Sequence, residues 1–93
     1  MTIGLLRIEF IIPSVNSLKG KRSLIKRMKS RVRKEFNVAV AEIDNLNNFG
    51  KGTIGFTTLS KDREMPQKIL NRVEEYVDKY FNIIVIDRLI ELF

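Results

Sequence analysis

The residues best suited to a chemical task are the cations of one segment, which reads SLKGKRSLIKRMKSRVRKEF over residues 17–36. This segment has nine of the chain's 17 Lys and Arg residues, and no acid lies among the nine. The remaining 8 cations are outnumbered by the chain's 11 acids, so the net charge of +6 belongs to this segment. This concentration of positive charge favours an acidic partner, with a nucleic acid first and an anionic membrane surface second. Contacts of Lys and Arg with phosphates would position a nucleic acid without reading its sequence. The nine are Lys19, Lys21, Arg22, Lys26, Arg27, Lys29, Arg31, Arg33 and Lys34.

A helix would arrange most of these cations in two rows. One row runs from Lys19 to Arg33 at spacings of three and four residues and extends about 21 Å, comparable with several successive phosphates. Arg27, Arg31 and Lys34 line the opposite flank of the apolar face. Like charges at these spacings repel, so the unrelieved charge favours a surface that binds a polyanion. The alternative is a solvated face that acids of the second predicted helix neutralise, in particular Glu64, Glu74 and Glu75.

Lys21 differs from the other cations because its helical angle places it on the apolar side. One interpretation is that it lies beyond the edge of the sheet and extends its ammonium group to water. The other is an anion site at the helix start, formed by Lys21, Arg22 and free backbone amides, where Gly20 lets a phosphate approach.

The loop NLNNFGKG adds two candidate binding residues, Phe49 and Lys51. Phe49 either folds back on the sheet as an anchor for the loop or stacks on an unpaired base. The strand after the loop resembles an RNA-recognition motif only superficially. Thr53 and Gly55 stand where stacking aromatic residues are required, and Phe56 is expected to face the helices.

Residues for catalysis and metal binding are scarce. The chain has no histidine and no cysteine, which removes the commonest general base, thiolate nucleophiles and ordinary zinc sites. Glu42 and Asp44 could form a carboxylate pair, but surface pairing with Lys or Arg across a hairpin is favoured. We therefore expect no enzymatic activity, no cofactor and no metal site.

Six elements are expected to position these residues. Alternation and the following Pro13 predict a strand over 2–12, and Ser17 is a plausible N-cap for the basic helix. Pro66 is tolerated only in a first turn, so the second helix should begin close to Arg63. The other predicted elements are strands over 37–44, 53–60 and 83–93, with the second helix within 61–81.

The order β-α-β-β-α-β predicts one ferredoxin-like α+β domain over residues 1–93, a four-stranded antiparallel sheet with both helices on one face. The other face of such a sheet is uncovered. Its side chains must meet water, a partner or another copy of the chain. Those expected there are Leu5, Ile11, Ala39, Ala41, Ile43 and the run from Ile83 to Ile86.

The first segment, IGLLRIEFII, has Arg7 and Glu9 at its centre and lacks a basic leader, so we expect neither a signal peptide nor a membrane span. The absence of cysteine fits a reducing compartment. A cytoplasmic protein without a membrane partner is the expectation.

The run SLKGKRSLIKRMKSRVRKEFNVAVAE, with LLRIEFIIP before it and LSKDRE near the middle, resembles the YlxP-like family of small uncharacterised bacterial proteins. The resemblance covers essentially the whole chain. It implies a ferredoxin-like fold in a bacterial cytoplasmic protein with no known enzymatic activity or cofactor. Family members are often encoded beside translation and ribosome-maturation genes, which favours a connection with RNA or the ribosome. The chain departs from the family at Gly20, where Glu is common, and at Phe49, where relatives tend to have Trp.

Together these observations favour a non-enzymatic RNA- or ribosome-associated binding module that uses the basic helix for phosphate contacts. One alternative is a structural homodimer formed through the open sheet face or an edge strand. A protein that binds a small anion at the start of the first helix is another.

Overall fold

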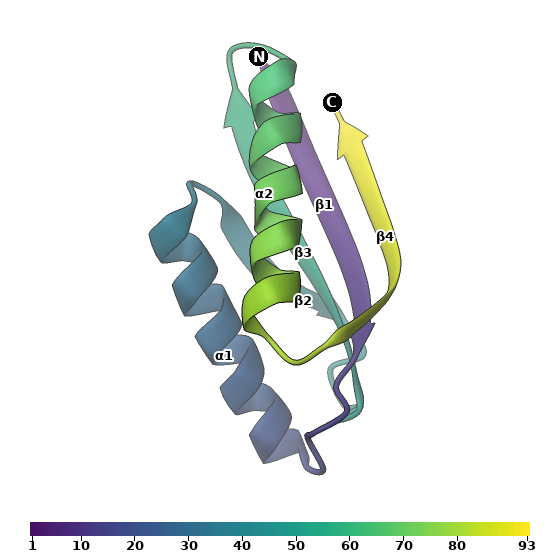
Figure 1. Cartoon of the computed structure of the whole chain (residues 1–93). Helices are drawn as coiled ribbons and strands as arrows, with labels where there is room; N and C mark the ends of the chain where they lie inside the picture. Colours follow the sequence, from purple (N-terminus) through teal and green to yellow (C-terminus); the bar gives the residue numbers. More distant parts are fainter.

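The computed structural model describes residues 1–93 and has the βαββαβ order of a ferredoxin-like fold (Figure 1). Its four strands form one sheet in the order β2-β3-β1-β4, and every neighbouring pair is antiparallel. The predicted fold class is therefore confirmed. The elements are β1 (Thr2–Ile11), α1 (Leu18–Glu35), β2 (Ala39–Asp44), β3 (Lys51–Ser60), α2 (Glu64–Tyr80) and β4 (Ile84–Leu92).

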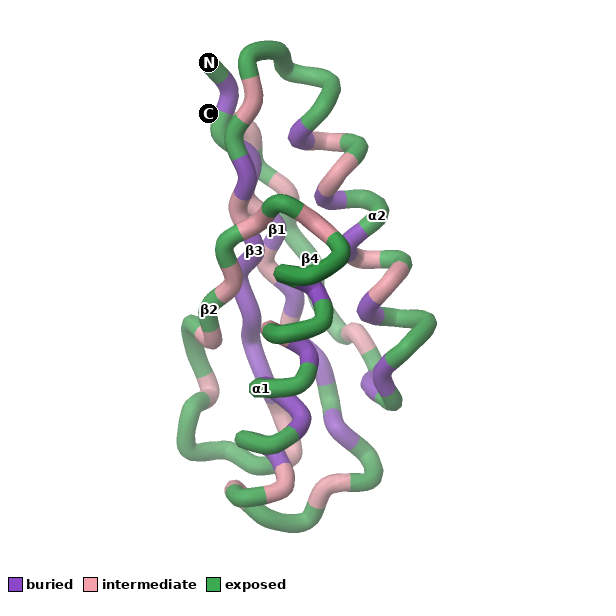
Figure 2. Tube along the Cα trace, turned by 90° about the vertical axis from the view of Figure 1, so that its left-hand side faces the viewer, coloured by how far each residue is buried: buried purple, intermediate pink, exposed green.

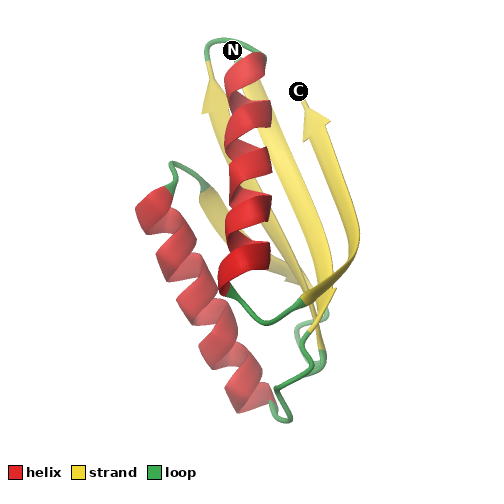
Figure 3. Ribbon diagram, viewed as in Figure 1, coloured by secondary structure: helices red, strands yellow, loops and turns green.

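Both helices lie on the same face of the sheet, with their axes running along the strands (Figure 3). The core lies between the helices and the sheet, because alternate residues of the central strands point to this side. Figure 2 shows that buried and exposed residues alternate along each helix, because only one side of the helix faces the sheet. The strand residues Leu6, Ile8, Phe10, Ile54 and Phe56 are fully buried, as are Met28, Val32, Leu70, Val73 and Val77 of the helices.

Both helices begin where the sequence predicts. Ser17 is the N-cap of α1, and its hydroxyl oxygen accepts a hydrogen bond from the backbone N–H of Gly20 at 3.0 Å. The α2 helix follows Arg63, with Pro66 in its first turn. A carboxylate oxygen of Asp62 accepts from the backbone N–H of Met65 at 2.9 Å and so satisfies one free amide of that turn. Neither helix is long and apolar enough to cross a lipid bilayer.

The third strand begins two residues earlier than predicted. Lys51 and Gly52 look like part of a turn, but they pair with Ile11 and Phe10 of β1. The reason is a close approach: a Cβ atom at Gly52 would lie 2.8 Å from Cζ of Phe10. Glycine therefore makes room for the buried Phe10 ring beneath it, and this contact extends the pairing of β3.

The sheet face without helices is partly apolar, as expected, with one exception. Ile11, Ile43, Ile84 and Ile86 are exposed. The prediction that Ile83 lies on this face is wrong, because this residue precedes β4 and is buried in the core.

Candidate nucleic-acid interface

The α1 helix presents most of its cations to solvent without neutralising them. Seven of the nine are exposed and Lys29 is half-buried. Only Lys21 has a carboxylate oxygen within 4.0 Å; the other eight have no ion pair within the chain. Within the helix no carboxylate is at hand, because no acid precedes Glu35, and no acid of another element forms an ion pair with these eight. The eight are Lys19, Arg22, Lys26, Arg27, Lys29, Arg31, Arg33 and Lys34.

The acids of α2 do not neutralise this surface, so that alternative is wrong. Glu74 pairs with Arg88 of β4, whose Nε donates to Oε2 of Glu74. This hydrogen bond raises the pKa of Arg88 above its ordinary value, with a smaller opposing effect of burial and a further contribution from the carboxylate's charge. Glu64 and Glu75 form no ion pair. No carboxylate of α2 therefore forms an ion pair with a cation of α1.

Four of the cations line a shallow groove between α1 and the edge strand β2. The groove has a volume of about 190 Å³ and also includes Ile25 and Glu42. Its cations are spaced three or four residues apart on one side of the helix, as the helical period requires. A groove of this kind fits a chain of phosphates that follows the helix. The cations are Arg22, Lys26, Lys29 and Arg33.

A second hollow lies on the outer side of α1 and has no apolar lining residue. Its volume is about 460 Å³, and its lining residues are Ser23, Lys26, Arg27, Ser30, Arg31 and Lys34. The guanidinium carbons of Arg27 and Arg31 each lie 5.8 Å from the ring centroid of Phe81. Such cation–π contacts position both arginines beside the end of α2 while leaving their charge free. Lys26 lines both hollows, so the cationic surface is continuous.

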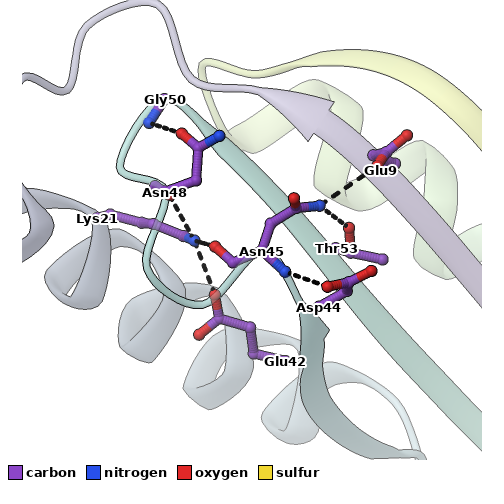
Figure 4. A network of polar contacts seen from close by, with 8 residues as sticks. All are labelled: Glu9, Lys21, Glu42, Asp44, Asn45, Asn48, Gly50 and Thr53. Carbon is purple, nitrogen blue, oxygen red and sulfur yellow. Dashed lines mark hydrogen bonds and ion pairs between the residues drawn. The ribbon is translucent and has the colours of Figure 1, made fainter.

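Lys21 has a different role from the other eight. The residue is 1% exposed, and its Nζ donates to the backbone carbonyl oxygens of Asn45 at 2.5 Å and Asn48 at 2.7 Å (Figure 4). Oε2 of Glu42 lies 2.9 Å from the same nitrogen. That contact lacks the angle of a hydrogen bond, so the buried oxygen is held by charge alone. Lys21 thereby ties the start of α1 to the loop between β2 and β3.

Both interpretations of Lys21 from sequence are therefore wrong. The side chain neither extends to water nor presents its ammonium group to an anion, because all three contacts are within the chain. Lys21 is also almost completely buried, so a phosphate in solution cannot reach its ammonium group. The small-anion alternative thus loses Lys21 from its site, and the amide of Gly20 is already bound to Ser17.

Asn45 organises the same loop, and sequence reasoning did not identify it. Its backbone has a φ of 59°, in the left-handed region that asparagine tolerates better than most residues. Its side-chain Nδ2 donates to Oγ1 of Thr53 at 2.7 Å and to Oε2 of Glu9 at 3.3 Å. Figure 4 shows that Asn45 therefore links α1, β1 and β3 through one residue. The available signal was an asparagine directly after a strand, at the start of a turn-rich loop.

The loop places Phe49 and Lys51 differently. Phe49 is 46% exposed in the short turn that Asn48 closes, where Oδ1 of Asn48 accepts from the N–H of Gly50. Lys51 already belongs to β3, and its ammonium nitrogen lies 3.5 Å from Oε2 of Glu9. Phe49 thus remains available to a ligand, whereas the charge of Lys51 is partly compensated.

The carboxylates Glu42 and Asp44 do not form a pair of free acids. Glu42 contacts Lys21, and Oδ1 of Asp44 accepts from the backbone N–H of Asn45 at 2.7 Å. Glu42 was expected to pair across the hairpin, which is wrong, because its partner comes from α1.

Comparison with known proteins assigns the chain to a family. Residues 3–89 match the family model described as "Protein of unknown function (DUF503)". The chain is also 35% identical over 78 residues to a Bacillus subtilis (strain 168) protein described as "Uncharacterized protein YlxP". The match covers 84% of this chain and 85% of that protein.

Proposed function

The chain belongs to the DUF503 family, and we propose that it is a non-enzymatic RNA-binding module whose α1 helix contacts the phosphate backbone. The observation that supports this most directly is that eight α1 cations have no carboxylate partner within the chain. Like charges held close together repel one another and destabilise the free protein, and a bound polyanion would remove this repulsion.

The groove beside β2 is where we expect the backbone to lie. Arg22, Lys26, Lys29 and Arg33 line it from one side. If all four contact phosphates, the logarithm of the association constant falls with the logarithm of salt at a slope of roughly −3 to −4. We choose RNA over DNA because of the family, whose members are often encoded beside translation genes.

The test is a salt titration with a structured RNA hairpin and a DNA hairpin of equal length. The triple variant Arg22→Glu, Lys26→Glu and Lys29→Glu should abolish binding. Any residual binding should depend less steeply on salt than that of the wild type. A matched control reverses three exposed cations outside α1, namely Lys61, Lys68 and Arg72, and changes the net charge equally. Equal losses in the two triple variants, or binding that ignores ionic strength, would contradict the proposal. Preference for the DNA hairpin would contradict the choice of RNA.

A further inference from the structure

The sheet face opposite the helices is a continuous surface with many exposed apolar side chains. Side chains alternate along a strand, and the buried Leu6, Ile8 and Phe10 of β1 point to the helices. Leu5, Arg7, Glu9 and Ile11 therefore point to the open face, together with the residues of β3 and β4 that pair with them. Single exposed apolar residues are ordinary, whereas a contiguous group of them marks an interaction site. The large exposed members are Ile3, Ile11, Ile43, Leu59, Ile84, Leu89 and Phe93, with Ile86 at the bulge of β4.

We propose that this open face, defined by those residues with Leu5, Arg7 and Glu9, binds the same face of a second copy of the chain. The inference does not depend on the proposed function, because the open face and α1 are on opposite sides of the sheet (Figure 1).

The charges of the open face disfavour a nucleic acid and permit self-association. The two cations that point to it, Arg7 and Lys51, are paired with Asp87 at 3.4 Å and Glu9 at 3.5 Å. Glu91 lies opposite Leu5 and adds an unpaired acid. A polyanion would therefore meet a slight excess of negative charge, whereas a second copy would meet apolar surface and charges of both signs.

The order of side chains on β1 is self-complementary. Along the open face β1 presents Leu5, Arg7, Glu9 and Ile11, with the apolar residues outside and the opposite charges inside. A two-fold axis that crosses the interface at the level of Ile8, perpendicular to β1, places Arg7 of one copy opposite Glu9 of the other and Leu5 opposite Ile11. An interface with this symmetry uses the same patch twice, as the commonest homodimers do.

The area is sufficient for a stable contact. The four strands have 10, 6, 10 and 9 residues. At about 3.3 Å per residue and about 4.8 Å between strands, the face spans about 550 Å² in each copy, or about 1,100 Å² for two. A specific interface should exceed about 1,000 Å². Packing two such faces would leave both α1 helices on the outside of the dimer.

The first test is the mass in solution by analytical ultracentrifugation across micromolar to millimolar protein, without nucleic acid. We expect a dimer for the wild type and a dissociation constant raised at least about tenfold by Leu89→Lys, which puts a charge on an open-face residue that is 42% exposed. The control is Met65→Lys on α2, at a residue that is 46% exposed and outside the face. It should leave the dimer intact.

The second test addresses the symmetry. Arg7→Glu alone and Glu9→Arg alone each place like charges opposite one another and should weaken the dimer. An equimolar mixture of the two variants pairs opposite charges again and should form a heterodimer. Circular dichroism checks that each variant is folded. A monomeric wild type, or a dimer that both Leu89→Lys and Arg7→Glu leave unchanged, would overturn the inference.

Discussion

The ammonium nitrogen of Lys21 lies 2.9 Å from Oε2 of Glu42, and both groups sit beneath the loop that joins β2 to β3. One cation of the basic segment is thus internal, while its neighbours remain free. The ion pair and the two carbonyl contacts of Lys21 fix the loop against the first turn of α1. The same helix therefore has a structural cation and a surface of available ones.

Replacing Lys21 by methionine should destabilise the protein by about 3–5 kcal/mol, because it leaves the Glu42 carboxylate and two carbonyl oxygens without their partner. Urea unfolding followed by circular dichroism measures the change. Lys19→Met is the control, since Lys19 is exposed in the same turn and has no ion pair. It should change the free energy of unfolding by less than about 0.5 kcal/mol. Equal effects of the two substitutions would show that Lys21 has no special role.

Glu42→Leu should recover part of the stability lost in Lys21→Met, because the double variant has no unpaired charge in the network. The double-mutant cycle should give a coupling free energy of about 1–3 kcal/mol between the two positions. The four proteins are compared by the same urea unfolding. Additive effects would mean that the 2.9 Å contact contributes nothing beyond the carbonyl bonds.

Asn45 should tolerate glycine better than valine. Both substitutions remove the bonds to Thr53 and Glu9, but only valine must adopt a φ near 59° with a β-branched side chain. We expect Asn45→Val to be less stable than Asn45→Gly by about 1–3 kcal/mol in thermal or urea unfolding. Equal stabilities would show that the loop changes its backbone conformation when the side chain is lost.

Sequence alone predicted the elements whose determinants are local. The α1 helix follows from its apolar period and the Ser17 cap, and the start of α2 follows from Pro66 in its first turn. The rows of cations follow from the same helical period. Whether α2 neutralises them could not be predicted, because Glu74 finds Arg88 on a strand that follows α2.

The position of Lys21 needed the structure for a similar reason. Its helical angle showed that it lies on the apolar side, but its partners are mostly backbone carbonyls, of Asn45 and Asn48, more than twenty residues away. Every residue has a carbonyl, so residue types do not indicate which ones converge on an ammonium group. The early start of β3 was missed likewise, because it depends on contacts with Phe10 of β1.

Gly52→Ala should destabilise the protein by about 1–3 kcal/mol, because the added Cβ would lie 2.8 Å from Cζ and 2.9 Å from Cε2 of the fully buried Phe10. The control is Gly50→Ala, where the nearest atom is Oδ1 of Asn48 at 3.7 Å and the backbone has no positive φ. Replacing the aromatic ring by the smaller side chain of leucine, in Phe10→Leu, should relieve the clash. The double variant should then be more stable than the sum of the two single losses predicts, as measured by urea unfolding. Strict additivity would mean that the strand shifts to accept the methyl group and that Gly52 is not what fixes the register of β3 against β1.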